Sequence, residues 1–220
     1  MTTEKLHFKT SSGIKSIVGK DLITDKFVAI FELVKNSYDA GAKQVTITFE
    51  RDRIIIWDNG HGMSKQDLVE KWLNLAYSDK KEGRNNNDRA FVGSKGIGRF
   101  SADRLGRKLK ITTKIKGESN LHKLLVDWEK FDVDLKKLFE KVELDYSFDK
   151  NLAEVELSYT KIEILDLNEV WTISEINKAK ESLKRLKNPF VKDDGFKILV
   201  IDKNELVESE EIIESNIDIR

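Results

Sequence analysis

The sequence predicts a layered α+β fold, in which helices pack on a sheet. The first observation is the order of the patterns: a helical segment, two strands, two more helical segments and then a run of strands. The second is that helices and strands do not alternate, as they would in a repeated βαβ fold. The third is the composition, 39% hydrophobic and 35% charged over 220 residues, which is typical of a globular domain with a charged surface.

The first helix is predicted over DKFVAIFELVKNSYDA, residues 25–40. Either Thr24 or Asp25 can cap its start, and Gly41 suits the position just after its end. Its apolar residues have the spacing of a helix with one buried face: 27, 28, 30, 31, 33 and 34.

Three polar residues follow one line along this helix. Glu32 and Asn36 are one turn apart, and Asp39 lies near the same line. An amide oxygen suits a hydrated Mg²⁺, and a carboxylate one turn away can orient or deprotonate a water. A solvated helix face has the same pattern, so this helix alone leaves both interpretations open.

Two strands and a glycine-containing loop come next. QVTITFE alternates as a strand does, RDR is a turn, and IIIW predicts a short central strand. Asp58 follows that strand directly, and Gly60 and Gly62 let the backbone approach a ligand closely. An ionised carboxylate only accepts hydrogen bonds, so Asp58 suits the amine of adenine and repels the carbonyl of guanine. An ordinary Asp-Asn-Gly turn remains the alternative.

The rest of the chain supplies further elements. Ser64 opens a helix over about residues 65–76 as S-x-x-D, and DKKEGRNNNDRA, residues 79–90, is a polar loop. A helix is expected over about 174–187, and the acidic tail NELVESEEIIESNIDIR, from Asn204 on, is a frayed helix or a cut boundary. The remaining strands are predicted over 108–115, 121–127, 153–166 and FKILVID.

A glycine-rich segment, GSKGIGRFS, precedes a helical pattern. Successive backbone N–H groups before a helix form an anion site, to which Lys95 can add a charge. The segment is not a Walker A loop, because G-x-x-x-x-G-K-[ST] is absent. It also lacks the third glycine and the strand–turn–helix context of a dinucleotide site. A flexible turn is the alternative.

Taken in order, ELVKNSYDA, DNGHGM and VGSKGIGRFS resemble the nucleotide-binding boxes of the GHKL superfamily, which includes gyrase, heat-shock chaperones, sensor histidine kinases and MutL. The resemblance covers residues 20–166. It implies a Bergerat ATP-binding fold, a two-layer α+β sandwich whose mixed, mostly antiparallel sheet carries helices on one face. It also implies a mobile lid over ATP. The first box is most similar to those of stand-alone bacterial MutL-, chaperone- and MORC-like ATPases.

The resemblance implies a role for each matching residue. Glu32 resembles the general base that polarises the hydrolytic water, Asn36 the Mg²⁺ ligand and Asp58 the acid that binds adenine. Asp39 has only a supporting role. The other residues expected to contact ATP are Gly60, Gly62 and Met63 below the base and Gly93, Lys95, Gly96, Ile97 and Gly98 in the lid.

The segment SYTKIEIL resembles the last box of the family. The resemblance implies that Thr160 lies on a strand and supports Asp58 through a water. The family usually has glycine before this threonine, whereas this chain has Tyr159.

The resemblance also implies an organisation. Residues 1–20 are an N-terminal strap, 21–166 the ATP-binding domain, and 167–220 an extension of that domain or the start of a missing one. Residues 79–92 form the lid. In the family ATP brings two such domains together, so an ATP-dependent homodimer is expected. DNA or protein partners would bind through domains outside this chain.

The predicted activity is Mg²⁺-dependent ATP hydrolysis with slow turnover. A non-hydrolysing ATP-binding switch and a histidine-kinase-like catalytic module are the alternatives. Sensor kinases usually lack a water-activating acid at the position of Glu32. They also need a phosphoaccepting histidine on a dimerisation helix, and His7, His61 and His122 lie in no such predicted helix.

Composition limits the kinds of metal site, partner and location that this chain can have. The chain has no cysteine, which excludes disulfides and thiolate metal sites. Its 39 basic and 39 acidic residues balance, so there is no general signal for nucleic acid or membrane. The start has no apolar run of signal-peptide length, and no segment approaches ~18 consecutive apolar residues. A cytoplasmic protein without a membrane partner is expected.

Overall fold

The structure, a computed structural model, describes Ser12 and residues 25–74, 101–134, 138–186, 195–204 and 209–213. Its α-helices are α2 (Lys26–Asp39), α3 (Lys65–Asp67), α4 (Ser101–Leu105) and α5 (Ile173–Leu183). Its strands are β1 (Gln44–Phe49), β2 (Arg53–Asp58), β3 (Gly106–Lys114), β4 (Asn120–Asp127), β5 (Asp145–Lys150), β6 (Tyr159–Leu167), β7 (Lys197–Asp202) and β8 (Ser209–Ile212).

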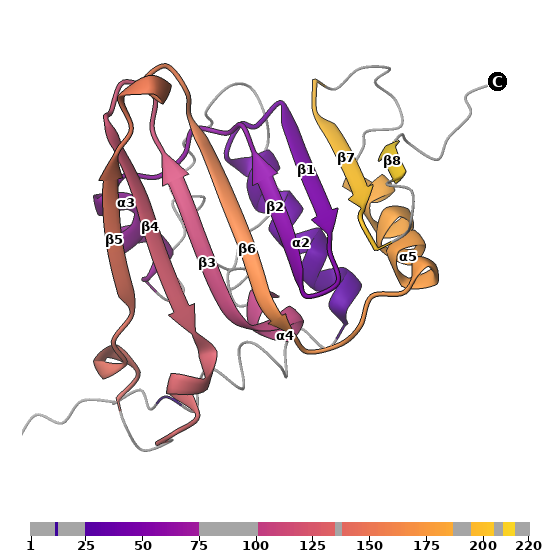
Figure 1. The fold of residues 1–220 in the computed structure, drawn as a ribbon, viewed down its shortest axis with the longest axis horizontal. Helices are drawn as coiled ribbons and strands as arrows, with labels where there is room; N and C mark the ends of the chain where they lie inside the picture. Colours follow the sequence, from indigo (N-terminus) through magenta and orange to yellow (C-terminus); the bar gives the residue numbers. More distant parts are fainter. Residues whose placement is uncertain are drawn as a thin grey trace, which may run out of the picture.

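These strands form one sheet in the order β5-β4-β3-β6-β2-β1-β7-β8 (Figure 1). Every neighbouring pair is antiparallel except β1 and β7, which run parallel. The predicted mixed, mostly antiparallel sheet is therefore confirmed. Strand β2 lies between β6 and β1, which agrees with the central position predicted from its apolar run.

Helix α2 begins and ends as its sequence predicts. Asp25 is the N-cap, and its side chain accepts a hydrogen bond from the N–H of Phe27 at 2.7 Å. At the other end Gly41 has a φ of 71°, the left-handed conformation that glycine adopts most easily. The apolar stripe of this helix is buried at Ala29, Ile30, Leu33 and Val34.

The helices form a second layer on one face of the sheet. In Figure 1, α2 lies behind β1 and β2, and it contacts both α4 and α5. Strand residues that face this layer are almost fully buried, among them Ile47, Ile54, Ile56, Leu109, Ile111 and Ile164. Each such side chain contributes about 1.5–3 kcal/mol through burial. Among the described residues no helix combines the length and apolarity needed to cross a bilayer.

Residues after β6 extend the same two layers. Strand β7 pairs with β1, and Phe196, Ile198 and Val200 are buried in the core. The ring of Trp171 lies 4.9 Å from that of Phe49. The division of the chain at residue 166 stays a prediction, but β7 and β8 belong to the sheet that carries β1 and β2.

Some predicted elements were wrong in extent. The helix after Ser64 does begin with a capping box to Asp67, but it continues as a π-helix (η2, Leu68–Trp72) and stops short of residue 76. The predicted strand over 153–166 starts only at Tyr159. The expected helix over 174–187 is α5 followed by one 3₁₀ turn, η8 (Lys184–Leu186). The other 3₁₀ helices are η5 (Trp128–Phe131), η6 (Phe139–Lys141) and η7 (Leu152–Glu154).

Two strands were not predicted at all. Strand β5, DYSFDK, is the edge of the sheet and mostly exposed, so it lacks the apolar alternation by which strands are recognised. In the acidic tail, residues 209–212 form β8 rather than a frayed helix, because pairing with β7 supplies their backbone hydrogen bonds.

Candidate functional site

Asp58 ends strand β2 with its side chain on the helical face of the sheet, where it is 4% exposed. Its Oδ2 accepts a hydrogen bond from Ser37 Oγ at 2.8 Å, and its Oδ1 accepts one from the N–H of Gly60 at 2.9 Å. Burial raises the pKa of the Asp58 carboxyl above its ordinary value, and the bonds from Gly60 and Ser37 oppose that rise. The carboxylate is thus a buried acceptor whose charged form is stabilised by Ser37, by Gly60 and by the backbone of Thr160.

The turn after Asp58 has no room for side chains at its two glycines. A Cβ at Gly60 would lie 2.8 Å from Asp58 Oδ1 and 2.9 Å from the carbonyl oxygen of Ala40. Gly62 has a φ of 70°, and a Cβ there would lie 1.9 Å from the carbonyl oxygen of Lys114. The glycines therefore let the turn pack against the end of α2 on one side and the end of β3 on the other.

Met63 and Thr160 join this site through a threonine that the sequence did not single out. The N–H of Met63 donates to Thr113 Oγ1 at 2.9 Å, and Thr113 Oγ1 lies 3.2 Å from Thr160 Oγ1. Thr160 is the residue of β6 that pairs with Asp58 of β2. The fold thereby brings together five predicted site residues: Asp58, Gly60, Gly62, Met63 and Thr160.

Tyr159 stands where the family usually has glycine, and its side chain lies away from the site. Because successive strand residues face opposite sides, Tyr159 packs on the other face, with its ring 6.5 Å from that of Trp57. Its hydroxyl donates to Glu154 Oε2 at 3.0 Å. Burial and this hydrogen bond raise the pKa of Tyr159 to about 12. The departure from the family pattern leaves the surroundings of Thr160 free of the ring.

Glu32 and Asn36 occupy α2, the helix that also supplies Ser37 to Asp58. Both are half-buried, as is Asp39, and Asn36 is the neighbour of Ser37 in sequence. Glu32 has a partner that was not predicted: its Oε1 accepts a hydrogen bond from Lys35 Nζ at 2.5 Å. The spacing of three residues on a helix was the available signal for this ion pair.

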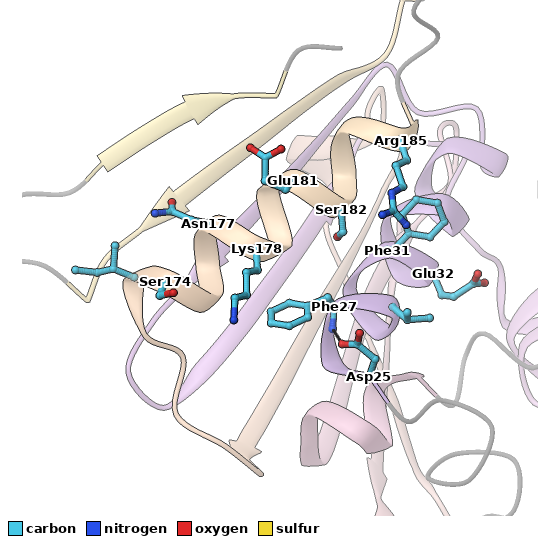
Figure 2. A pocket seen from close by; sticks show the side chains of 12 residues that line it. Asp25, Phe27, Phe31, Glu32, Ser174, Asn177, Lys178, Glu181, Ser182 and Arg185 are labelled. Carbon is cyan, nitrogen blue, oxygen red and sulfur yellow. Dashed lines mark hydrogen bonds between the residues drawn. The ribbon is translucent and has the colours of Figure 1, made fainter. Parts of the chain in front are cut away.

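A cavity with a volume of about 1060 Å³ lies elsewhere, between α2 and α5. Of the predicted site residues that the structure describes, only Glu32 lines this cavity. Figure 2 shows the Glu32 carboxylate directed away from α5, whereas Phe27 and Lys178 lie between the two helices. This cavity is therefore distinct from the turn around Asp58.

Several predicted residues lie outside the described residues: Gly93, Lys95, Gly96, Ile97 and Gly98, together with the lid 79–92 and, apart from Ser12, the strap 1–20. Helix α4, which follows the glycine-rich segment, contacts α2. The roles of the lid glycines and of the strap stay predictions.

Sequence reasoning missed two site residues, Ser37 and Thr113. Ser37 carried a signal, because it continues the buried stripe of Ile30, Leu33 and Val34 with a hydroxyl in place of an apolar side chain. Thr113 carried none, because Thr112 beside it is identical and only the register of the sheet decides which one faces the helices.

The residues present fit Mg·ATP. The held carboxylate of Asp58 offers acceptors to an amine, and a Cβ at Gly60 would lie 2.8 Å from its Oδ1 and crowd it. One helical turn apart, the amide of Asn36 supplies an oxygen of the kind that binds Mg²⁺, and the carboxylate of Glu32 supplies oxygens that accept a hydrogen bond from a water.

Comparison with known proteins identifies the family of this chain. Residues 24–160, more than half of the chain, match the family described as histidine kinase-, DNA gyrase B-, and HSP90-like ATPase. The mitochondrial TNF receptor-associated protein 1 homolog of Dictyostelium discoideum is 31% identical over 139 residues, 51% of this chain and 20% of that protein. Chaperone protein HtpG of Rickettsia prowazekii (strain Madrid E) is 28% identical over 149 residues, 56% of this chain and 24% of that protein.

The chain thus spans less than a quarter of the length of either relative. The family match, by contrast, includes α2, the Asp58 turn and the start of β6. The chain therefore belongs to the histidine kinase-, DNA gyrase B- and HSP90-like ATPases, the GHKL superfamily.

Proposed function

We propose that this chain binds Mg·ATP beside the Asp58 turn and hydrolyses it slowly, with Glu32 as general base. One observation carries the proposal: the buried carboxylate of Asp58, held by Ser37 and Gly60 at the edge of a glycine turn. Family membership supports ATP as the ligand.

Asp58 recognises the base in this proposal. An ionised carboxylate has about four lone-pair positions, of which Ser37, Gly60 and the backbone of Thr160 take at most three. Those that remain accept a hydrogen bond from the exocyclic amine of adenine. Guanine has a carbonyl oxygen there, which the carboxylate repels. Gly60, Gly62 and Met63 form the turn below the base, and Thr160 supports Asp58 from the neighbouring strand.

Glu32 acts on the hydrolytic water. Lys35 occupies its Oε1, which leaves Oε2 to accept a proton from a water one helical turn from Asn36. The amide oxygen of Asn36 would hold the magnesium ion. When bound, this ion neutralises negative charge on the phosphates. The backbone N–H groups of Gly93, Gly96 and Gly98 contact the phosphates from the lid, with Ile97 between them and Lys95 adding a positive charge.

Nucleotide state is coupled to closure of the lid 79–92 and to association of two copies through the strap 1–20. The GHKL resemblance supports this part of the proposal. Relatives named as chaperones are consistent with a domain that passes its nucleotide state to other segments. DNA or protein partners would bind through such segments.

The test compares the wild type with Glu32→Ala, in Mg·ATP calorimetry and in phosphate release. Both proteins are expected to bind ATP, and the substitution lowers release by about 100-fold or more, the usual contribution of a general base. Glu70→Ala, which removes an exposed acid from η2, is the control and should keep both properties. Light scattering of Glu32→Ala with ATP should show the mass of a dimer.

Other results of this test would contradict particular parts of the proposal. Equal phosphate release from wild type and Glu32→Ala would remove Glu32 from the chemistry. Binding without release in the wild type would favour the non-hydrolysing switch or the kinase-like module. Absence of ATP binding would refute the nucleotide site itself.

A further inference from the structure

The hydroxyl of Thr113 lies at the centre of the site without being one of the residues expected to contact the nucleotide. Thr113 is completely buried on β3. Its Oγ1 lies 2.9 Å from the N of Met63, 3.0 Å from the carbonyl oxygen of Tyr159 and 3.2 Å from Oγ1 of Thr160. One hydroxyl therefore connects the glycine turn, strand β3 and strand β6.

The direction of each of these hydrogen bonds follows from counting protons. A hydroxyl has one proton to donate and two lone pairs to accept with. The N–H of Met63 only donates, so Thr113 accepts there, and the carbonyl of Tyr159 only accepts, so Thr113 donates there. The remaining lone pair of Thr113 accepts from Thr160, whose hydroxyl proton is then committed.

This commitment sets the polarity of Thr160. With its own proton directed at Thr113, the Thr160 oxygen can only accept on its open side. Thr160 pairs with Asp58 across β6 and β2, so two acceptors stand side by side at this edge of the sheet. Two acceptors match an amine, directly or through one water, and they leave a carbonyl oxygen without a donor.

Thr113 also holds the glycine turn after Asp58 in place beside the two acceptors, Asp58 and Thr160. It fixes the N–H of Met63, while the backbone at Gly62 packs on the carbonyl of Lys114, the next residue of β3. Without the hydroxyl of Thr113, the backbone N–H of the half-buried Met63 would lose this hydrogen-bond acceptor. An unpaired backbone donor is costly.

We infer that Thr113 is a positioning residue that determines the preference for adenine over guanine, by making Thr160 an acceptor and by holding the turn. The inference rests on the proposed nucleotide site and adds a residue to it. Substitution by valine keeps the shape of Thr113 and removes its hydroxyl, which frees the proton of Thr160 to point at a guanine carbonyl.

The test measures dissociation constants for ATP and GTP by calorimetry in wild type, Thr113→Val, Thr113→Ser and Thr112→Val. Thr113→Val should lower the preference for ATP over GTP about tenfold, the effect of about 1.4 kcal/mol, which is within the range for one hydrogen bond. Thr113→Ser keeps the hydroxyl and should retain the preference. Thr112→Val makes the same change on the opposite face, in the groove with Trp57 and Tyr159, and should also retain it.

Two results would overturn the inference. One is an unchanged ATP-to-GTP ratio in Thr113→Val. The other is an equal loss of affinity for both nucleotides, which a merely structural role would produce. If Thr113→Val does not fold, Thr113→Ala against Thr113→Ser gives the same comparison, since both lack the methyl group and only serine has the hydroxyl. A wild type that binds neither nucleotide would instead refute the proposed function on which the inference rests.

Discussion

Burial and hydrogen bonding shift the pKa of the Asp58 carboxyl in opposite directions. Burial raises its pKa, whereas Gly60 and Ser37 favour the charged form. The net direction is upward, so folding favours the protonated acid. This carboxyl therefore contributes its full stability below its ordinary pKa and loses that contribution as the pH rises through its folded-state pKa. At neutral pH, burying the ionised carboxyl of Asp58 therefore lowers the stability of the fold, although the proposed recognition of adenine depends on this residue.

Asp58→Asn separates these two effects. ATP affinity should fall about tenfold or more, because the amide can turn an NH₂ toward the amine that needs an acceptor. The substitution should have the opposite effect on stability. As the pH rises from 3 to 7, the free energy of unfolding of the wild type should fall relative to that of Asp58→Asn. Calorimetry and urea denaturation across this range measure both. Unchanged ATP affinity would refute the contact with adenine, and a stability difference independent of pH would refute the role of burial.

Between elements, one buried lysine joins the starts of α2 and α5. Lys26 Nζ lies 2.5 Å from Glu175 Oε1 and 3.1 Å from Glu169 Oε2, and Arg104 of α4 contacts Glu169 at 2.6 Å. Although burial lowers the pKa of Lys26, the hydrogen bonds to Glu175 and Glu169 raise it overall. The bond from Lys26 in turn lowers the pKa of Glu175 to about 2. These contacts link α2, α4 and the start of α5.

Lys26→Met should lower the free energy of unfolding by about 1 kcal/mol at pH 7, since charge-assisted hydrogen bonds are lost from a partly exposed cluster. Because the folded-state pKa of Glu175 is depressed, the stability it gains is present above its ordinary value of 4.5 and is lost as the pH falls toward 2. Urea denaturation from pH 7 to pH 3 should show the difference between the variants shrinking below pH 4.5. Lys178→Met, an exposed position on α5, is the control and should match the wild type throughout.

Across the whole molecule, the segment after residue 186 completes the core next to the candidate site. Strand β7 covers the edge of β1 by parallel pairing, which a helix-containing crossover makes possible. Its buried residues Ile198 and Val200, with Phe196 before them, lie in the same core as α2. The ring of Phe196 lies 5.1 Å from that of Tyr38. The C-terminal part of the chain therefore supports the helix that carries Glu32 and Asn36.

A chain ending at residue 186 should lose its cooperative thermal transition. Each of the three core side chains contributes about 1.5–3 kcal/mol by burial, which together is a large part of the ~5–15 kcal/mol by which domains are stable. A chain ending at residue 204 keeps β7 and loses β8, most of which is exposed, so it should unfold cooperatively at a lower midpoint. Circular dichroism on heating distinguishes the two. An unchanged midpoint for the shorter chain would contradict the role of β7.

Much of this protein was readable from the sequence because the signals are local. Capping by Asp25, the left-handed Gly41, the central strand ending at Asp58 and the capping box at Ser64 depend on neighbouring residues, and all four are found. The three nucleotide-binding boxes are equally local, so the family could be named before any contact was known. The edge strand β5 and the tail strand β8 were missed, because their pairing partners, not their own patterns, make them strands.

Only the tertiary structure decided which residues meet. Asp58 lies 21 positions from Ser37, and Thr113 is 50 positions from Met63, so no local pattern could join them. The register of β6 against β2 and β3 placed Thr160 beside Asp58 and Thr113, and it turned Tyr159 to the other face. The sequence by itself determined the family and those elements whose capping residues or apolar patterns are local, because both rest on short-range chemistry. The hydrogen-bond network around Asp58 required the sheet, because strand register sets both the partners and the face of each side chain.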